Sequence, residues 1–268
     1  MLSYFFQIIP MTIPAHTPEW EVYFCDINER PACVSVDLAY EHEAPIPEKD
    51  RAFELVVALQ QADADGFPAD EAEWEQLEAI EEALVDEFQN SLQAAFVGKL
   101  LHDGKRSFYF YSAQEALPEV IAANIMQQFP AYTYSTNTLH DPDWGLYLDF
   151  LFPEPVDMQS IKNSRILRMM EEQGDEHHIP RSVSHFISFA TEDKRADFKR
   201  AAEAAGYTLV QEGKNQNESD VPYSIVLSKV QAVTEEDIHN VTLELWQMAE
   251  EFEGAYGGWQ AQVVREND

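Results

Sequence analysis

Apolar residues recur every three or four positions near the end of the chain. They are Ile238, Val241, Leu245, Ala249 and Phe252. This spacing places them on one buried face of a long helix. Thr234, with Asp237 three residues later, is a variant of the capping box and predicts the helix start.

Glycines follow this helix and predict how it ends. Gly254 is expected to stop the helix, because glycine adopts the left-handed backbone of a C-terminal cap. The run Tyr256–Trp259 contains Gly257 and Gly258 and is expected to turn the chain. A short closing strand is then predicted at residues 260–264.

Strand and helix patterns also alternate between residues 20 and 152. A hairpin is predicted first, since turn-forming residues separate two runs rich in Val, Tyr, Phe and Cys. Asp103-Gly104 predicts a second, tight hairpin. The predicted elements are strands at 20–25, 31–38 and 53–59, a helix from Asp70, strands at 92–101 and 107–111, a helix from Ser112 to Gln128, a strand at 132–138, and a closing segment at 146–152.

The two helices of this half are predicted from their apolar faces. Asp70 with Glu73, and Ser112 with Glu115, indicate their starts. The predicted inward residues are Trp74, Leu77, Ile80, Leu84 and Phe88 on the first helix, and Leu117, Val120, Ile121 and Ile125 on the second.

Two prolines in Phe152–Val156 predict a linker. Beyond it, the order of strands and helices resembles that of the first half. The predicted elements are helices at 158–172, 192–205 and 234–253, and strands at 183–189, 207–211, 222–230 and 260–264. The split β-α-β order packs helices on one face of an antiparallel sheet. We therefore predict an α+β protein of two ferredoxin-like (βαββαβ) sandwiches, 1–153 and 154–268, the first with an extra N-terminal β-hairpin.

The chain is strongly acidic. Its 49 acidic and 17 basic residues give a formal charge of −32, and residues 1–159 carry −23 of it. Such a charge repels phosphate backbones and anionic lipid, so neither nucleic acid nor a membrane is an expected partner. It favours a basic protein partner. A well-solvated acidic protein without such a partner is the alternative.

The cellular compartment is predicted from the disulfide, membrane and export signals that the sequence lacks. Cys25 and Cys33 do not form a disulfide framework, and no stretch approaches the roughly 18 apolar residues of a membrane helix. The hairpin would place the two cysteines opposite each other as small buried thiols. The apolar start has no basic flank, so a cytoplasmic protein is expected, with Met11 as an alternative start.

Catalytic motifs are sparse. The sequence has no G-x-S-x-G, P-loop or G-x-G-x-x-G motif. His177, His178 and His185 have metal-ligand chemistry, but adjacent residues on an extended chain point in opposite directions. We therefore expect no catalytic residue, cofactor or metal. The basic residues Lys194, Arg195, Lys199 and Arg200 alternate with acids and predict a helix surface crossed by ion pairs.

Aromatic residues near the C-terminus supply the candidate binding site. Large aromatics are mostly buried, so core packing is one interpretation of Trp246, Tyr256 and Trp259. The other is an interaction surface, because Tyr and Trp often anchor interfaces. We take Trp246, Tyr256, Gly258 and Trp259 as candidate partner-binding residues.

Residues 160–264 resemble the regulator of ribonuclease E activity B family. The resemblance is carried by Ile166–Gly174, Pro180–His185, Pro222-Tyr223, and the run Leu245–Phe252 ending in Tyr256–Trp259. Members commonly have Asp at the position of Gly257, and the best-known end in an acidic tail that this chain lacks. The resemblance implies a ferredoxin-like fold and protein binding that inhibits or retunes RNA degradation, without catalysis.

Residues 20–153 resemble the bacterial family called domain of unknown function 695. The matching motifs are Leu77–Glu82, Val97-Gly98, Gly104–Tyr111, and Asp141–Trp144 with Tyr147. This resemblance implies no activity.

Three functional hypotheses follow from the sequence. The first is a non-catalytic regulator that binds a basic protein partner, with ribonuclease E as the candidate. The second is an enzyme or small-ligand-binding protein that uses a cleft between the domains, with His177, His178 or His185 in its site. The third is a stress or housekeeping scaffold with no discrete site.

Overall fold

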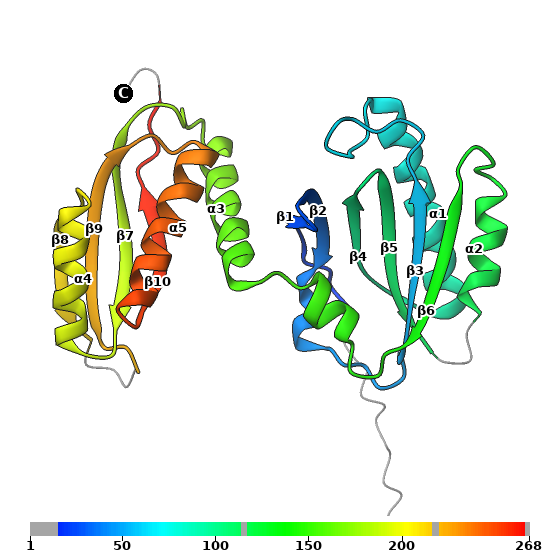
Figure 1. Ribbon diagram of the computed structural model, residues 1–268, viewed down its shortest axis with the longest axis horizontal. Coiled ribbons are helices and arrows are strands. Elements are labelled where there is room, and N and C mark those ends of the chain that lie inside the picture. Colours follow the sequence, from blue (N-terminus) through cyan, green and yellow to red (C-terminus); the bar gives the residue numbers. More distant parts are fainter. Residues whose placement is uncertain (1–15, 114–116, 216–219, 266–268) are drawn as a thin grey trace, which may run out of the picture. The chain divides into compact units, whose positions relative to one another are not determined.

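The computed structural model describes residues 16–113, 117–215 and 220–265. The chain divides into two compact units, one ending at Phe152 and the other beginning at Pro153. Each unit contains an antiparallel sheet, of six and four strands respectively (Figure 1). This confirms the predicted mixture of helices and antiparallel sheets. The alternative start at Met11 lies outside the described residues. None of the described helices combines the length and apolarity needed to cross a bilayer.

The first unit is a six-stranded sheet with helices on one face. Its strands lie in the order β1-β2-β4-β5-β3-β6. Its elements are β1 (Trp20–Ile27), β2 (Arg30–Asp37), η1 (Leu38–His42), β3 (Arg51–Ala58), α1 (Glu71–Leu92), β4 (Ala95–His102), β5 (Lys105–Ser112), α2 (Pro118–Met126), β6 (Tyr134–His140) and η2 (Leu146–Leu151).

Helix α1 begins where the capping pattern predicts. The Asp70 carboxylate accepts a hydrogen bond from the Glu73 backbone N–H at 2.9 Å. Four of the five predicted inward residues, Leu77, Ile80, Leu84 and Phe88, are fully buried. The prediction for Trp74 is wrong, since 38% of this residue is exposed. Glu73 is buried instead, and its carboxylate accepts a hydrogen bond from the Gln60 backbone N–H at 3.0 Å.

Helix α2 begins later than predicted. Ser112 is buried at the end of β5, and Glu115 lies outside the described residues. The N-cap is Leu117, without a side-chain cap, and Pro118 is the first helical residue. Proline fixes the backbone angle that a helix start needs. This start turns Leu117 and Val120 outward, so their predicted burial is wrong. The buried residues of α2 are Pro118, Ala122, Ile125 and Met126.

An aromatic cluster covers the other face of this sheet. The closing segment 146–152 forms a short π-helix, η2. Trp144 stacks on Tyr111 with ring centroids 4.1 Å apart, and its indole N–H donates to the Lys49 carbonyl. The Tyr147 hydroxyl donates to the Asp37 carbonyl at 2.8 Å. These contacts tie η2 and the preceding Trp144 to the chain between the end of β2 and the start of β3.

The two hairpins of this unit form where turn residues predict them. Asp103 and Gly104 both have positive φ, as a tight primed turn requires. In the β1–β2 hairpin, Cys25 pairs with Ala32, whereas Cys33 pairs with Phe24. Residues directly opposite share a face, so the two thiols lie on opposite faces of the hairpin. The expected cross-strand pair is wrong, and both cysteines are half-buried and form no disulfide.

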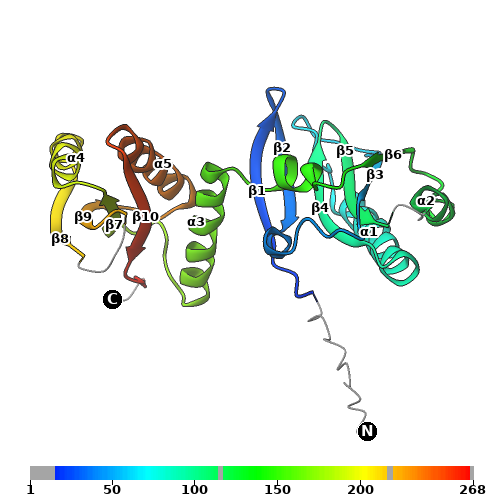
Figure 2. The same ribbon diagram turned by 90° about the horizontal axis from the view of Figure 1, so that it is seen from below.

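The second unit is a four-stranded sheet in the order β10-β7-β9-β8. Helices α4 and α5 lie on one face of the sheet, and α3 packs beside α5 (Figure 2). Its elements are α3 (Pro155–Glu172), β7 (Arg181–Phe189), α4 (Glu192–Ala204), β8 (Thr208–Lys214), β9 (Tyr223–Gln231), α5 (Glu235–Glu251) and β10 (Gly254–Ala261).

Helix α5 confirms the periodicity at the end of the chain. The Thr234 hydroxyl accepts from the Asp237 N–H at 3.2 Å, and the predicted apolar face is buried apart from the half-buried Phe252. The predicted glycine cap is wrong, because Glu253 takes the left-handed conformation with φ +56°. Gly254 instead starts β10, where a Cβ atom would lie 2.2 Å from the Phe189 ring.

The predicted turn at Tyr256–Trp259 is also wrong. These residues lie within β10, which pairs with β7 over Gly254–Ala261. The register shifts between Tyr256 and Gly258, so Gly257 is the extra residue of a β-bulge. The bulge keeps both Tyr256 and Trp259 on the face that carries the helices, because they pair with Ile187 and His185.

Candidate functional site

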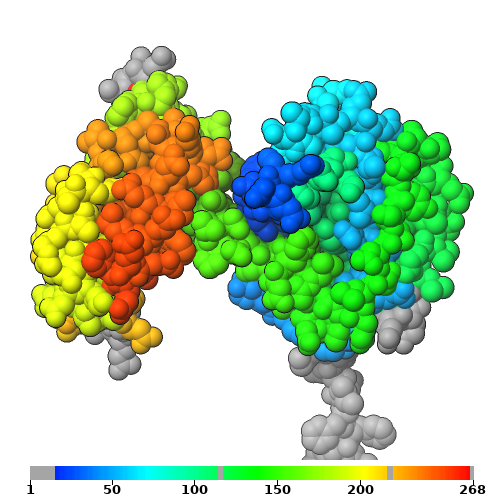
Figure 3. All heavy atoms as spheres, viewed as in Figure 1, coloured from blue at the N-terminus to red at the C-terminus, as the bar shows by residue number. Residues whose placement is uncertain are grey.

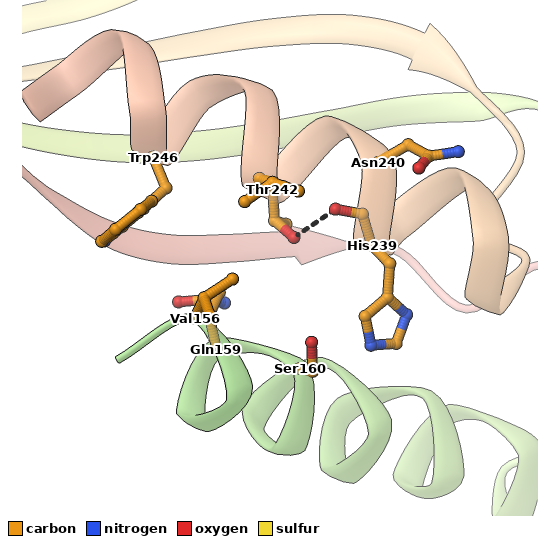
Figure 4. A pocket seen from close by; sticks show the side chains of 8 residues that line it. Val156, Gln159, Ser160, His239, Asn240, Thr242 and Trp246 are labelled. Atoms are coloured by element: carbon orange, nitrogen blue, oxygen red, sulfur yellow. Dashed lines mark hydrogen bonds between the residues drawn. The ribbon is translucent and has the colours of Figure 1, made fainter. Parts of the chain in front are cut away.

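A small depression separates α3 from α5 and contains Trp246. Its volume is about 80 Å³, and α5 contributes most of the wall (Figure 4). Trp246 is half-buried, so its ring is accessible from outside. The outer surface of α5 is visible in Figure 3 as part of the orange-to-red region. The lining residues are Val156, Gln159, Ser160, His239, Asn240, Thr242, Leu243 and Trp246.

A buried polar network lies beneath this depression. Asn163 of α3 is fully buried, and its amide N–H donates to the Thr242 hydroxyl at 2.7 Å. Its amide oxygen accepts from the Trp259 indole N–H and from the Gln159 amide, both at 2.9 Å. The network joins α3, α5 and β10, so it fixes the helix pair that carries Trp246.

Of the four predicted site residues, two aromatics face the interior. Trp259 is 5% exposed and belongs to the core. Tyr256 is half-buried, and its hydroxyl is hydrogen-bonded to His185 Nδ1 at 2.9 Å. Gly258 lies in the bulge with φ +109°. The fold thus brings Trp259 under the α3–α5 depression, while Tyr256 belongs to a neighbouring cluster around His185.

His185 is a neutral buried imidazole. Desolvation lowers its pKa to about 4, and the charge of Lys229 acts in the same direction. Burial also raises the pKa of the Tyr256 hydroxyl, so that group stays protonated. Within the described part of the chain, the Nε2 atom of His185 has no hydrogen-bond partner, and it is shielded from solvent. It therefore has no route to a substrate in solution.

Acidification is expected to weaken the second unit through His185. Its pKa lies below the ordinary value of 6.5, so its stabilising contribution is complete above pH 6.5 and is lost as pH falls toward 4. Between pH 7 and pH 5 the free energy of unfolding should fall by about 2 kcal/mol from this group. Hydrogen exchange of β7 peptides measures this change. His185→Gln should remove the contribution, and exposed His178→Gln should leave it intact; equal pH dependence in both variants contradicts the assignment.

The other histidines and the basic residues singled out from the sequence lie at separate places in the second unit. His177 Nε2 lies 3.6 Å from Asp175, and the exposed His178 lies 3.6 Å from Glu176. Within the ranges that the structure describes, no three His, Cys, Asp or Glu residues are placed to hold a metal ion. The predicted ion pairs on α4 are present at all four basic residues, Lys194, Arg195, Lys199 and Arg200. Arg195 is also buried and donates to the Gly213 carbonyl.

The first unit matches a known sequence family. Residues 18–152 fit the model of a family of unknown function, DUF695. The chain belongs to the DUF695 family. This DUF695 protein has a second match: residues 160–261 fit the model described as regulator of ribonuclease activity B. Both resemblances inferred from the sequence are thereby confirmed. The Asn163 network and the depression around Trp246 lie in the second match, apart from Val156 and Gln159.

Other comparisons add little to the DUF695 assignment. No curated protein matches the chain. A crystal structure of an unknown protein from Galdieria sulphuraria is 10% identical, covers 81% of this chain and 99% of that chain, and has a TM-score of 0.22. A hypothetical protein of known structure is 8% identical, covers 91% and 94%, and has a TM-score of 0.17. Neither likeness carries an argument about fold or function.

Sequence reasoning missed Asn163 and Thr242. Each is a polar residue on the apolar face of an amphipathic helix, the position where a side chain needs a buried partner. Asn163 lies between the inward residues Ile161 and Leu167, so its position in the sequence could have indicated a buried polar residue. Its partners lie 79 and 96 residues away and could not be identified from spacing.

Proposed function

We propose that this protein is a non-catalytic regulator that binds a basic protein of the RNA-degradation machinery, with ribonuclease E as the candidate. The observation that carries the proposal is the match of residues 160–261 to the regulator of ribonuclease activity B model. The binding surface we propose is the α3–α5 depression, with Trp246 as its anchor. Trp259 supports this surface from below through Asn163.

Charge supports a basic partner. The chain carries −32, and Glu250 is exposed one helical turn after Trp246. An aromatic ring with a carboxylate one helical turn away suits a surface rich in Arg and Lys, because cations bind both the ring face and the acid. Long-range attraction would also accelerate association at low salt.

The chemistry of the described side chains supports a role without catalysis. His185 is shielded, and the His177 and His178 rings each lie beside a single carboxylate. A general base must reach the proton that it abstracts, and none of these three imidazoles faces the depression around Trp246. His239 does line the depression, and its Nδ1 is hydrogen-bonded to the Glu235 carbonyl of its own helix. Inhibition by occupying the partner's surface requires no such group.

The proposal extends to the fold of both units. In the second, the order β7-α4-β8-β9-α5-β10 with the antiparallel sheet β10-β7-β9-β8 supports a ferredoxin-like sandwich. In the first, β3-α1-β4-β5-α2-β6 with the sheet segment β4-β5-β3-β6 supports the same assignment, with the β1–β2 hairpin added at one edge. We place the domain boundary within the proline-containing segment 152–156.

Binding to purified ribonuclease E, together with its turnover of an RNA substrate, tests the proposal. We expect binding that weakens as salt rises, and reduced turnover. Trp246→Ala should weaken binding about 30-fold, as expected for an aromatic anchor. Trp74→Ala is the matched control, because Trp74 is also partly exposed but lies in the other unit. Absence of binding at low salt with unchanged turnover would refute the proposal, and equal effects of the two variants would refute the surface.

A further inference from the structure

A second concavity lies in the first unit, where α1 leaves part of the sheet uncovered. Its volume is about 250 Å³. Two neighbouring rows of side chains cross the sheet here, one through Val22, Ser35 and Lys99 and the next through Phe24, Cys33, Leu101 and Arg106. Directly paired residues share a face, so these rows form the floor. The lining residues are Val22, Cys33, Ser35, Trp74, Glu78, Lys99, Leu101 and Arg106.

The floor carries two cations that share one carboxylate. Lys99 Nζ lies 2.6 Å from Glu81 Oε1, and Arg106 Nη2 lies 2.9 Å from Glu81 Oε2. One positive charge is therefore left over at this point, although the residues up to 159 carry −23. Glu78 is the other carboxylate of the pocket and is exposed to solvent, where water screens its charge.

Arg106 is buried but incompletely paired. It is 4% exposed, and its guanidinium lies between the rings of Trp74 and Phe108, at 5.8 and 5.6 Å from their centroids. Its Nε atom has no hydrogen-bond partner among the residues that the structure describes. Arg106 shares the Glu81 carboxylate with Lys99, and such a buried cation is costly unless further acceptors are supplied. An anion entering the pocket would supply them.

Exposed apolar side chains lie in and around the concavity. Trp20, Val22, Phe24 and Trp74 are all among the large apolar residues left open to solvent. Val22 and Trp74 line the pocket itself, while Trp20 and Phe24 extend the same face of β1. Apolar side chains gathered around buried polar groups are the usual composition of a ligand site.

We propose that this pocket binds a small monocarboxylic acid with an aromatic or branched apolar body. The carboxylate pairs with Lys99 and Arg106, and the body packs against Trp74, Val22 and Leu101. The volume limits the ligand to a small molecule. A single uncompensated cation matches a monoanion, whereas a phosphate dianion would bring a second, unmatched charge close to Glu81.

Protection of Cys33 from alkylation tests the site in the full-length protein. Cys33 lines the pocket, and Cys25 lies on the opposite face of the hairpin, so Cys25 is an internal control. The probe is 3-phenylpropionate at concentrations up to about 10 mM, the weak end expected for so small a ligand. We expect slower iodoacetamide labelling at Cys33 alone, and no protection by 3-phenylpropionamide or inorganic phosphate. Calorimetric titration gives the dissociation constant independently of thiol reactivity.

Two variants separate the contributions of charge and shape. Lys99→Gln should weaken binding by about tenfold or more, because it removes a charge-assisted hydrogen bond. Val22→Trp should block the pocket, and it changes an exposed strand residue that tolerates an aromatic side chain. Equal binding of acid and amide would overturn carboxylate recognition. Stronger binding of phosphate would overturn the monoanion class, and no binding by either method would overturn the site.

Discussion

Replacing Arg181 with methionine is expected to destabilise the second unit by about 3–5 kcal/mol, the cost of leaving a buried charge unpaired. Arg181 and Asp175 form an ion pair whose side chains are 5% and 0% exposed. The guanidinium also donates to the carbonyls of Ile179 and Gln262, both at 3.0 Å. Asp175 accepts from the Val264 N–H at 2.7 Å. One ion pair thus joins the loop after α3 to the segment after β10.

Hydrogen exchange of peptides from β7 and β10 measures this loss in the second unit alone. Arg200→Met is the control, because the Arg200–Asp197 pair lies on the surface, where ion pairs contribute about 0–1 kcal/mol. Arg181→Lys should retain only part of the stability, since an ammonium group cannot reproduce the planar fork of donors. If Arg181→Met proves no more destabilising than Arg200→Met, the buried pair does not stabilise the unit.

Sequence patterns correctly predicted the helices, the cap and the turn that depend on residues close together in the chain. The apolar period of α1 and α5, the Thr234 cap and the Asp103-Gly104 turn depend on residues within a few positions of each other, and the structure reproduces them. The same local reasoning failed at Tyr256–Trp259, because two glycines resemble a turn. The real constraint on Gly257 is the approach of β7, because a Cβ atom there would lie 3.3 Å from the Phe186 carbonyl oxygen. The constraint on Gly258 is its φ of +109°.

The candidate site depends on pairings that sequence spacing does not contain. Trp259 meets Asn163 across 96 residues, and Tyr256 meets His185 across 71. Trp246 could be named from its residue type alone, but its position above the Asn163 network follows from the packing of α3 on α5. The placement of Cys25 and Cys33 on opposite faces also depends on the pairing register of the hairpin. A shift of this register by one residue would move every side chain of a strand to the other face.

The polar core of the second unit suggests different roles for its two tryptophans, Trp259 in the fold and Trp246 in partner binding. Trp259 and Asn163 are inaccessible to a partner, yet they determine where α3 lies against α5. Trp246 is accessible and makes no side-chain hydrogen bond in the network. A buried network with matched donors and acceptors fixes one arrangement of its helices, because alternatives leave polar groups unpaired. The exposed residue can then change with little effect on the fold.

Trp259→Ala is accordingly expected to cost about 3–5 kcal/mol of stability in the second unit, the usual range for a buried tryptophan. Trp259→Phe should cost about 1–3 kcal/mol, since it retains an aromatic ring but leaves Asn163 short of a donor. Trp246→Ala should cost at most about 1 kcal/mol, because its ring is only half-buried.

Unfolding measured by hydrogen exchange, alongside partner binding at a temperature where all variants are folded, separates the two roles. Trp246→Ala should lose binding with near-normal stability, and Trp259→Phe should lose stability with near-normal binding. The reverse pattern would show that Trp259 acts on the partner and that Trp246 only supports the fold.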